Sequence, residues 1–218
     1  MVRLSCILLF LIVAMAAARA DDVEDFRAAA KAGDLVQAEA ILERGLSLDA
    51  TDSLGSTPLH WATAGGNKDI VLLLIEKGAD VNAKNQLNWT PLHIAAAKDY
   101  RELSAILIGK GADVEAKHVM GWTPLHIAAG KNRTEIAEML IQAGAKVDET
   151  SEAGDTPLHR AAGEGRVEVA ALLIRKGARV NIRNHDGKTP LDIAVEREQK
   201  ALADVLRNHG AKTGKEIE

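Results

Sequence analysis

Aromatic residues and cysteine are scarce in this chain of 218 residues. Phe, Trp and Tyr together make up 3% of the sequence, whereas hydrophobic residues make up 47%. Ala, Leu, Ile and Val must therefore build the core. The one cysteine, Cys6, lies inside an apolar N-terminal run. Beyond that run no disulfide can form, so the fold must be stable through packing alone.

A large charge excess is also lacking, because the formal net charge is only −4. The acidic excess is concentrated in residues 21–54, which contain nine acidic and three basic residues. We interpret this segment as a solvated end that discourages further stacking. The alternative is a role in steering a basic partner.

What the sequence does contain is a tetrapeptide that recurs every 33 residues. Thr-Pro-Leu-His begins at Thr57, Thr90, Thr123 and Thr156, and a fifth copy at Thr189 reads Thr-Pro-Leu-Asp. A second marker keeps the same period, namely Gly45, Gly78, Gly111, Gly144, Gly177 and Gly210. A fixed period of this length is typical of a solenoid, in which each repeat packs on its neighbours.

The two markers define one structural repeat. Thr before Pro predicts a helix start, and the His three residues after Thr can bond back to it as in a capping box. A second helix is expected after a turn and ends at the periodic glycine. The turn comes nine residues after each Thr, where a left-handed backbone is expected at Gly66, Asp99, Asn132, Gly165 and Glu198.

These repeats resemble the ankyrin repeat family over about residues 23–211. The resemblance implies an all-α repeat solenoid, in which each repeat is a helix-turn-helix plus a β-hairpin-like loop. About six repeats are expected, the first and last acting as caps. The departures are Asn88 in place of a loop glycine, Asp192 in place of the last His, and Phe26 at the Leu position of a first repeat that lacks the tetrapeptide.

The predicted organisation places a leader before the repeats. Arg3 and the apolar run that follows, with an Ala-x-Ala cleavage site at Ala18–Ala20, predict a signal peptide, so the mature chain would begin at Asp21. The alternative is an uncleaved membrane anchor. The expected segments are a signal peptide (1–20), an N-terminal capping repeat (21–54), ankyrin repeats (55–87, 88–120, 121–153 and 154–186), a C-terminal capping repeat (187–211) and a flexible tail (212–218).

Enzyme chemistry is not indicated. The equivalent histidines His60, His93, His126 and His159 would form a ladder, but equivalent positions in adjacent repeats lie on the order of 10 Å apart, too far to share one metal ion. His118, His185 and His209 show no ligand spacing. There is no nucleophile motif and no phosphate-binding glycine loop. We therefore expect no catalytic residues, no metal and no cofactor.

Nucleic acid is not expected as a partner either. Basic residues between 154 and 186 are spread over both predicted helices and the loop, and the chain is acidic overall. We interpret them as a solvated face, with a contact for an acidic protein as the alternative. They are Arg160, Arg166, Arg175, Lys176, Arg179 and Arg183.

The candidate binding residues occupy positions that stacking does not require. The resemblance implies a binding face formed by the loop tips and the ends of the first helices. At those positions two adjacent repeats carry an apolar patch with a basic rim, which favours an interface. The alternative is that each Trp only shields the neighbouring loop. The predicted partner-binding residues are Leu87, Trp89, Lys98, Val119, Met120, Trp122 and Lys131; Trp61, by contrast, is expected in the core.

These residues predict a non-enzymatic protein-binding scaffold, periplasmic or secreted, without stable membrane insertion once the leader is removed. Three alternatives remain open. The protein is a secreted effector that acts on a host protein, it self-associates through the same patch as a structural protein, or it is an enzyme of an unrecognised kind. The sequence does not identify the partner.

Overall fold

The computed structural model describes residues 21–217. The expected signal peptide, including Cys6, lies outside the described residues. The described chain falls into two compact units that meet between Gln86 and Leu87, here called unit 1 and unit 2. Each unit is described by itself.

Unit 1 contains two helix pairs. A helix over residues 21–32 is followed by α2 (Leu35–Glu43), and α3 (Pro58–Gly65) is followed by α4 (Lys68–Glu76). Phe26 is fully buried, and its ring lies 6.3 Å from that of Trp61. The expectation that Trp61 is a core residue is confirmed, because only 7% of its surface is exposed and its indole N–H donates to Asp52 at 3.1 Å.

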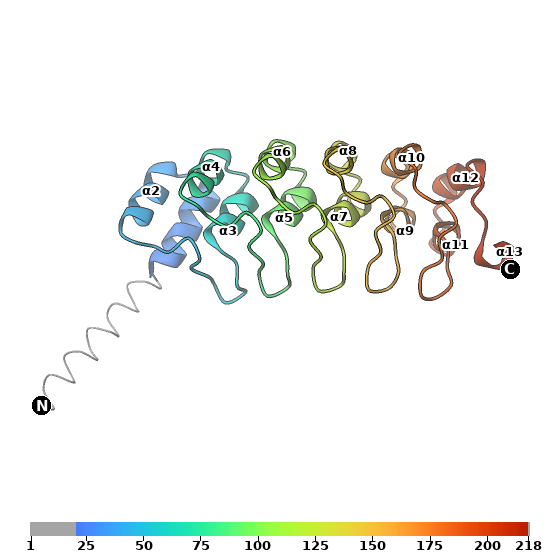
Figure 1. Ribbon diagram of the computed structural model, residues 1–218, viewed down its shortest axis with the longest axis horizontal. Helices are drawn as coiled ribbons and strands as arrows, with labels where there is room; N and C mark the ends of the chain where they lie inside the picture. The colour runs from blue at the N-terminus through green and yellow to red at the C-terminus, as the bar shows by residue number, and fades with distance from the viewer. Residues whose placement is uncertain (1–20, 218) are drawn as a thin grey trace, which may run out of the picture. The chain divides into compact units, whose positions relative to one another are not determined.

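Unit 2 contains four helix pairs and a short final helix. Figure 1 shows the pairs of unit 2 following one another, with the connecting loops on one side of the helices. The pairs are α5 (Pro91–Lys98) with α6 (Arg101–Gly109), α7 (Pro124–Gly130) with α8 (Thr134–Gln142), α9 (Pro157–Gly163) with α10 (Val167–Arg175), and α11 (Pro190–Glu196) with α12 (Lys200–Asn208); α13 (Gly214–Ile217) ends the described chain.

Each Thr-Pro starts a helix in the predicted way. The threonine is the N-cap and the proline is the first helical residue of α3, α5, α7, α9 and α11. In α7 the backbone N–H of Thr123 donates to His126 Nδ1 at 3.2 Å, and the threonine hydroxyl lies 2.9 Å from the same nitrogen. The imidazole therefore completes the capping box that the sequence predicts.

The turn between the two helices of a pair requires a left-handed backbone. The expected turn residues all have positive φ, including three that are not glycine: Asp99 at 64°, Asn132 at 58° and Glu198 at 57°. Asp and Asn tolerate this region, whereas Glu does so less readily. The sequence prediction for these turns is confirmed.

The core consists of aliphatic side chains and alanines. Leu92, Leu125 and Leu158, which follow the proline of each first helix, are fully buried. The alanine pairs of the same helices are also fully buried, for example Ala128 and Ala129. Small side chains let α5, α7, α9 and α11 pack in direct succession, and α6, α8, α10 and α12 form a second layer.

The loops are not strand hairpins, because residues 21–217 contain no β-strand. In unit 2 a backbone hydrogen bond closes the base of the loops at 118–122, 151–155 and 184–188, as from His118 N–H to the Trp122 carbonyl at 3.1 Å. One further bond joins each of these three loops to the preceding one, as from Val119 N–H to the Leu87 carbonyl at 3.1 Å. The loops of unit 2 are thus fixed by a few specific bonds rather than by a sheet.

The C-terminal segment differs from the expectation of a flexible tail at 212–218. Residues 212–217 fold back onto the last repeat, where the Gly214 N–H donates to Asp192 Oδ2 at 2.7 Å. The Thr189 hydroxyl donates to the Lys212 carbonyl at 2.8 Å. Asp192 replaces the usual histidine, and its carboxylate accepts the N–H of the returning chain. The substitution therefore allows residues 212–217 to attach to α11.

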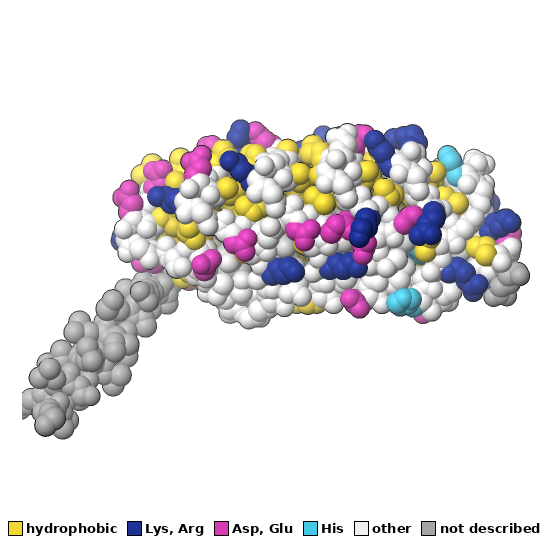
Figure 2. Space-filling model, viewed as in Figure 1, with side chains coloured by type: hydrophobic (Ala, Val, Ile, Leu, Met, Phe, Trp, Pro, Cys, Tyr) yellow, Lys and Arg dark blue, Asp and Glu magenta, His cyan; other side chains and the backbone are white. Residues whose placement is uncertain are grey.

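Charged side chains on the loop side pair across repeats. Figure 2 shows acidic and basic side chains side by side on the face in view. Lys117 lies 2.6 Å from Glu149, and Arg179 lies 2.9 Å from Asp148. Exposed pairs of this kind contribute little to stability. They do cancel most of the local charge, in keeping with a solvated face for Arg179.

Candidate functional site

The seven predicted binding residues all lie in unit 2, in the first loops and at the ends of α5 and α7. Three apolar side chains at the loop tips are exposed: Leu87 (55%), Val119 (52%) and Met120 (54%). Trp89 and Trp122 are half-buried, and Lys98 and Lys131 are exposed. The five apolar residues, called the aromatic patch below, are Leu87, Trp89, Val119, Met120 and Trp122.

The two tryptophans are linked through His118, which the sequence does not indicate as a binding residue. His118 is buried and its ring is stacked on that of Trp89, with centroids 5.7 Å apart and planes 6° apart. The same imidazole lies 5.2 Å from the Trp122 ring at a tilt of 53°. His118 Nδ1 accepts the Met120 N–H at 2.9 Å, so the ring is neutral there. Burial lowers the pKa of His118.

The backbone of Trp122 is fixed by the preceding repeat. Its carbonyl accepts the His118 N–H and also lies 3.0 Å from His93 Nε2. Because His93 Nδ1 accepts the Thr90 N–H at 3.2 Å, the ring proton resides on Nε2 and is donated to this carbonyl. His126 and His159 make the same bond to the carbonyls of Asp155 and Lys188, at 2.9 and 3.1 Å. The histidine ladder therefore joins successive repeats, a role beyond the capping that the sequence predicts.

Arg160 is the residue that sequence reasoning assigned wrongly. The sequence predicts that Arg160 belongs to a solvated face, but its guanidinium carbon lies 3.9 Å from the centroid of the Trp122 ring. This distance is well within the range of a cation–π contact. A signal was present, because Arg160 takes the helix position that Ile94, Ile127 and Ile193 occupy in the other repeats.

Trp89, Trp122 and Arg160 enclose a pocket of about 200 Å³, called the Arg160 pocket below. Trp89, Ile127 and Trp122 supply apolar surface, and Lys131, Arg160 and Glu164 supply charged groups. Sequence reasoning had named both tryptophans and Lys131 as binding residues, but not Ile127 or Glu164. The lining residues are Trp89, Ala97, Trp122, Ile127, Gly130, Lys131, Arg160 and Glu164.

The guanidinium of Arg160 is incompletely paired. Its Nε is buried and has no hydrogen-bond partner among the described residues. Glu164 is 3.9 Å away and is shared with Arg166 at the same distance. Burial lowers the pKa of Arg160, partly offset by Glu164 and Asp155. A further anion at this place would therefore be stabilised.

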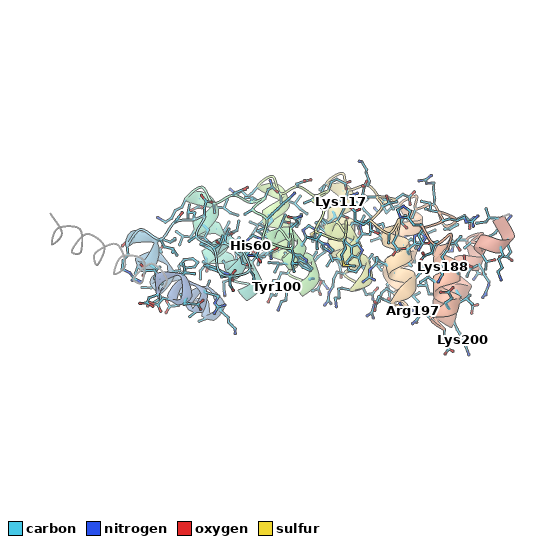
Figure 3. All side chains as sticks on the ribbon, turned by 90° about the horizontal axis from the view of Figure 1, so that it is seen from below. His60, Tyr100, Lys117, Lys188, Arg197 and Lys200 are labelled. Carbon is cyan, nitrogen blue, oxygen red and sulfur yellow. The ribbon has the colours of Figure 1, made fainter. Side chains whose placement is uncertain are left out.

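The ends of the first helices carry charges of both signs. Lys98, the last residue of α5, is equivalent in sequence to Lys131, Glu164 and Arg197, which directly follow α7, α9 and α11. Asp99 follows Lys98, and Glu196 and Glu198 flank Arg197. Figure 3 shows Arg197 on the opposite edge of unit 2 from Lys117, which precedes His118 at the loop side.

The described residues offer little to other chemistries. Between residues 21 and 217, no three His, Cys, Asp or Glu side chains come together where they could hold a metal ion. Nor does any helix in that range have the length and apolar character needed to cross a membrane.

Comparison with known proteins identifies the repeats. The sequence model described as ankyrin repeats (3 copies) matches residues 83–151 and 144–216, and the single ankyrin repeat model matches residues 54–86. A search of curated proteins gave no match. The two family models together span residues 54–216, well over half of the sequence. With its repeated helix pairs, connecting loops and periodic Thr-Pro-Leu-His, the chain belongs to the ankyrin repeat family.

Proposed function

We propose that this protein is a non-enzymatic scaffold that is exported and binds a partner protein through the aromatic patch and its basic rim. Ankyrin repeats generally mediate protein–protein binding. The observation that carries the proposal is the exposure of Leu87, Val119 and Met120 beside two half-buried tryptophans.

The composition of the patch supports an interface. Monomeric proteins rarely leave several large apolar side chains together at the surface without a use. Trp and Met are enriched in interfaces, whose rims are polar and solvent-accessible. Lys98 and Lys131 provide such a rim.

Rigidity also supports the proposal. The ring of Trp89 is stacked on His118, and the backbone of Trp122 is fixed by two hydrogen bonds. Side chains already held in one place lose little conformational freedom on binding, so more of the contact energy appears as affinity.

Export is supported by the sequence of residues 1–20, with its basic start, apolar run and Ala-x-Ala site. The lack of cysteine after Asp21 is compatible with an oxidising compartment. We propose a periplasmic or secreted location on this basis. An effector acting on a host protein would use the same export step.

Photo-crosslinking in the native cells tests the proposal. A photoreactive residue in place of Met120 should capture a partner protein from the periplasm or the medium. The crosslinked form of this protein should begin at Asp21. The same probe at Gln142, exposed at the end of α8, should not capture the partner. In purified form, Trp89→Ala with Trp122→Ala should weaken binding of that partner by about 3 kcal/mol or more.

The control is Val195→Ala, which removes an exposed apolar side chain elsewhere in unit 2. It should leave affinity unchanged, and both variants should retain the helical circular dichroism signal. Unchanged affinity in the double Trp variant would rule out this site. If Met120 captures only a second copy of the chain, and light scattering shows a dimer that the double variant lacks, self-association through the patch replaces the scaffold proposal.

A further inference from the structure

The size of the Arg160 pocket fits one side chain. Sites for drug-sized molecules are usually about 300 Å³ or larger, whereas this pocket measures about 200 Å³. Trp89, Ile127 and Trp122 provide an apolar surface within it. An aliphatic or aromatic side chain has the size to fit there.

The charged groups of the Arg160 pocket favour a second, different chemical group on the ligand. Arg160 is part-buried, its Nε has no hydrogen-bond partner among residues 21–217, and Glu164 approaches no closer than 3.9 Å. Arginine presents several N–H groups in a planar fork that matches a carboxylate. The Nε is buried, but 27% of the side chain is exposed, so the terminal N–H groups of the planar fork are the donors suited to an anion.

The charge around the pocket points the same way. Lys131 and Arg160 line it, and Glu164 is the one acidic residue of the lining. This local positive excess occurs in a chain whose formal net charge is −4. The lining is therefore complementary to an acidic segment.

From these three observations we infer that the Arg160 pocket binds an apolar side chain that is flanked by carboxylates, presented by an acidic segment of the partner protein. The inference rests on the proposed function and specifies the partner's chemistry. Single-stranded nucleic acid is the other polyanion to consider. It is disfavoured because Arg160 already covers one face of Trp122 and His118 already stacks on Trp89, which leaves less aromatic surface for bases.

Synthetic peptides test the inference without the native partner. The probes are fluorescent heptapeptides with a central Leu or Phe, flanked by Asp and Glu, by Asn and Gln, or by Lys. Fluorescence polarisation measures their binding to the chain from Asp21 onward. The acidic set should bind about tenfold or more tightly than the amide set, and the basic set should be weakest. A labelled oligothymidylate serves as the nucleic-acid probe.

Arg160→Gln should remove most of the preference for acidic over amide peptides while leaving the preference for a central apolar residue. The matched control is Arg175→Gln, which removes the same charge from an exposed position at the end of α10. It should behave as wild type. Lys131→Glu provides a second variant at an exposed residue, should Arg160→Gln reduce stability, and it should weaken the acidic peptides at least tenfold.

Three results would overturn the inference: equal affinity for acidic and amide peptides, no measurable peptide binding, or tighter binding of oligothymidylate than of the acidic set. Its failure is distinguishable from failure of the scaffold proposal. If the double Trp variant loses the native partner but Arg160→Gln and Lys131→Glu retain it, the patch binds a partner that is not acidic.

Discussion

In this protein a single side chain can both cap a helix and join two successive repeats. His126 accepts the Thr123 N–H through Nδ1 and donates through Nε2 to the Asp155 carbonyl of the following loop. Both bonds require a neutral imidazole with its proton on Nε2. Protonation would add a hydrogen to Nδ1, which could then no longer accept the Thr123 N–H, so the capping contact would be lost.

The pKa of His126 yields a prediction at this scale. Burial lowers it from 6.5 to about 4, against a smaller opposing contribution from the Asp155 hydrogen bond. Below pH 6.5 the unfolded chain takes up the proton and the folded chain does not, so the free energy of unfolding falls as the pH decreases toward 4. His126 alone should lower it by about 2 kcal/mol between pH 7 and pH 5.

Urea denaturation at the two pH values measures the loss, and NMR titration of the ring protons of His126 measures its pKa. In the folded protein the His126 resonances should shift only near pH 4. A midpoint near 6.5 in the folded state would contradict the assigned role.

Residue-scale sequence reasoning succeeded where the relevant contact is local. The left-handed turn at Asn132 and the capping role of His126 depend on neighbours a few residues away, and both follow from the repeat. Arg160 could not be assigned in the same way, because its contact with Trp122 crosses two repeats. Only its departure from the Ile of other repeats hinted at a different role.

At the scale of elements, short helices are made stable by their ends and by their neighbours. First helices of seven or eight residues, such as α7 and α9, are too short to be stable alone. Each begins with a capping box and a proline. The 33-residue period predicted these helices well, because caps and turns are encoded within one repeat.

Helix α13 was not predicted, because Asp192, the residue that holds it in place, is distant in sequence. Asp192 lies in α11, and burial raises its pKa, but hydrogen bonds from Thr189 and Gly214 outweigh burial and leave the pKa below its ordinary value. The carboxylate therefore attaches residues 212–217 to the last repeat. No local pattern in the polar C-terminal sequence indicates this contact.

Asp192→Ala should release this segment. The change leaves the Gly214 and Thr189 N–H groups without their acceptor, which costs about 1–3 kcal/mol for buried donors. Hydrogen exchange of Gly214 should become as fast as in an unstructured peptide, while the α7 amides stay protected. Asp204→Ala, at an exposed position of α12, is the control and should not change Gly214 exchange. Rapid exchange of Gly214 in the unaltered protein would refute the attachment.

At the scale of the molecule, cohesion in unit 2 runs from each repeat to the next. The first helices pack in the order α5, α7, α9 and α11, and the second helices in the order α6, α8, α10 and α12. Stability in such an array is approximately a sum of repeat and nearest-neighbour terms. A destabilising substitution in the last repeat should therefore affect only that repeat, whereas one in a middle repeat should also affect the repeats on both sides.

Two matched substitutions test this expectation. Leu140 in α8 and Leu206 in α12 are both fully buried, so Leu→Ala at either should cost about 2–5 kcal/mol. Hydrogen exchange of Leu206→Ala should show loss of protection in α11 and α12 only. Leu140→Ala should reduce protection in the pairs on both sides of α8. Equal loss throughout residues 87–217 in both variants would indicate one all-or-none unit instead.

The hydrogen bonds of the histidine ladder have a consequence for how recognition can change in this chain. Trp122, Asp155 and Lys188 differ completely in chemistry, yet each is fixed by the same imidazole N–H to its main-chain oxygen. A bond to the peptide group does not depend on the attached side chain. The side chain of the residue before each threonine can therefore change while its backbone hydrogen bond is kept. Substitutions at these positions can alter what the protein binds without weakening the attachment between repeats.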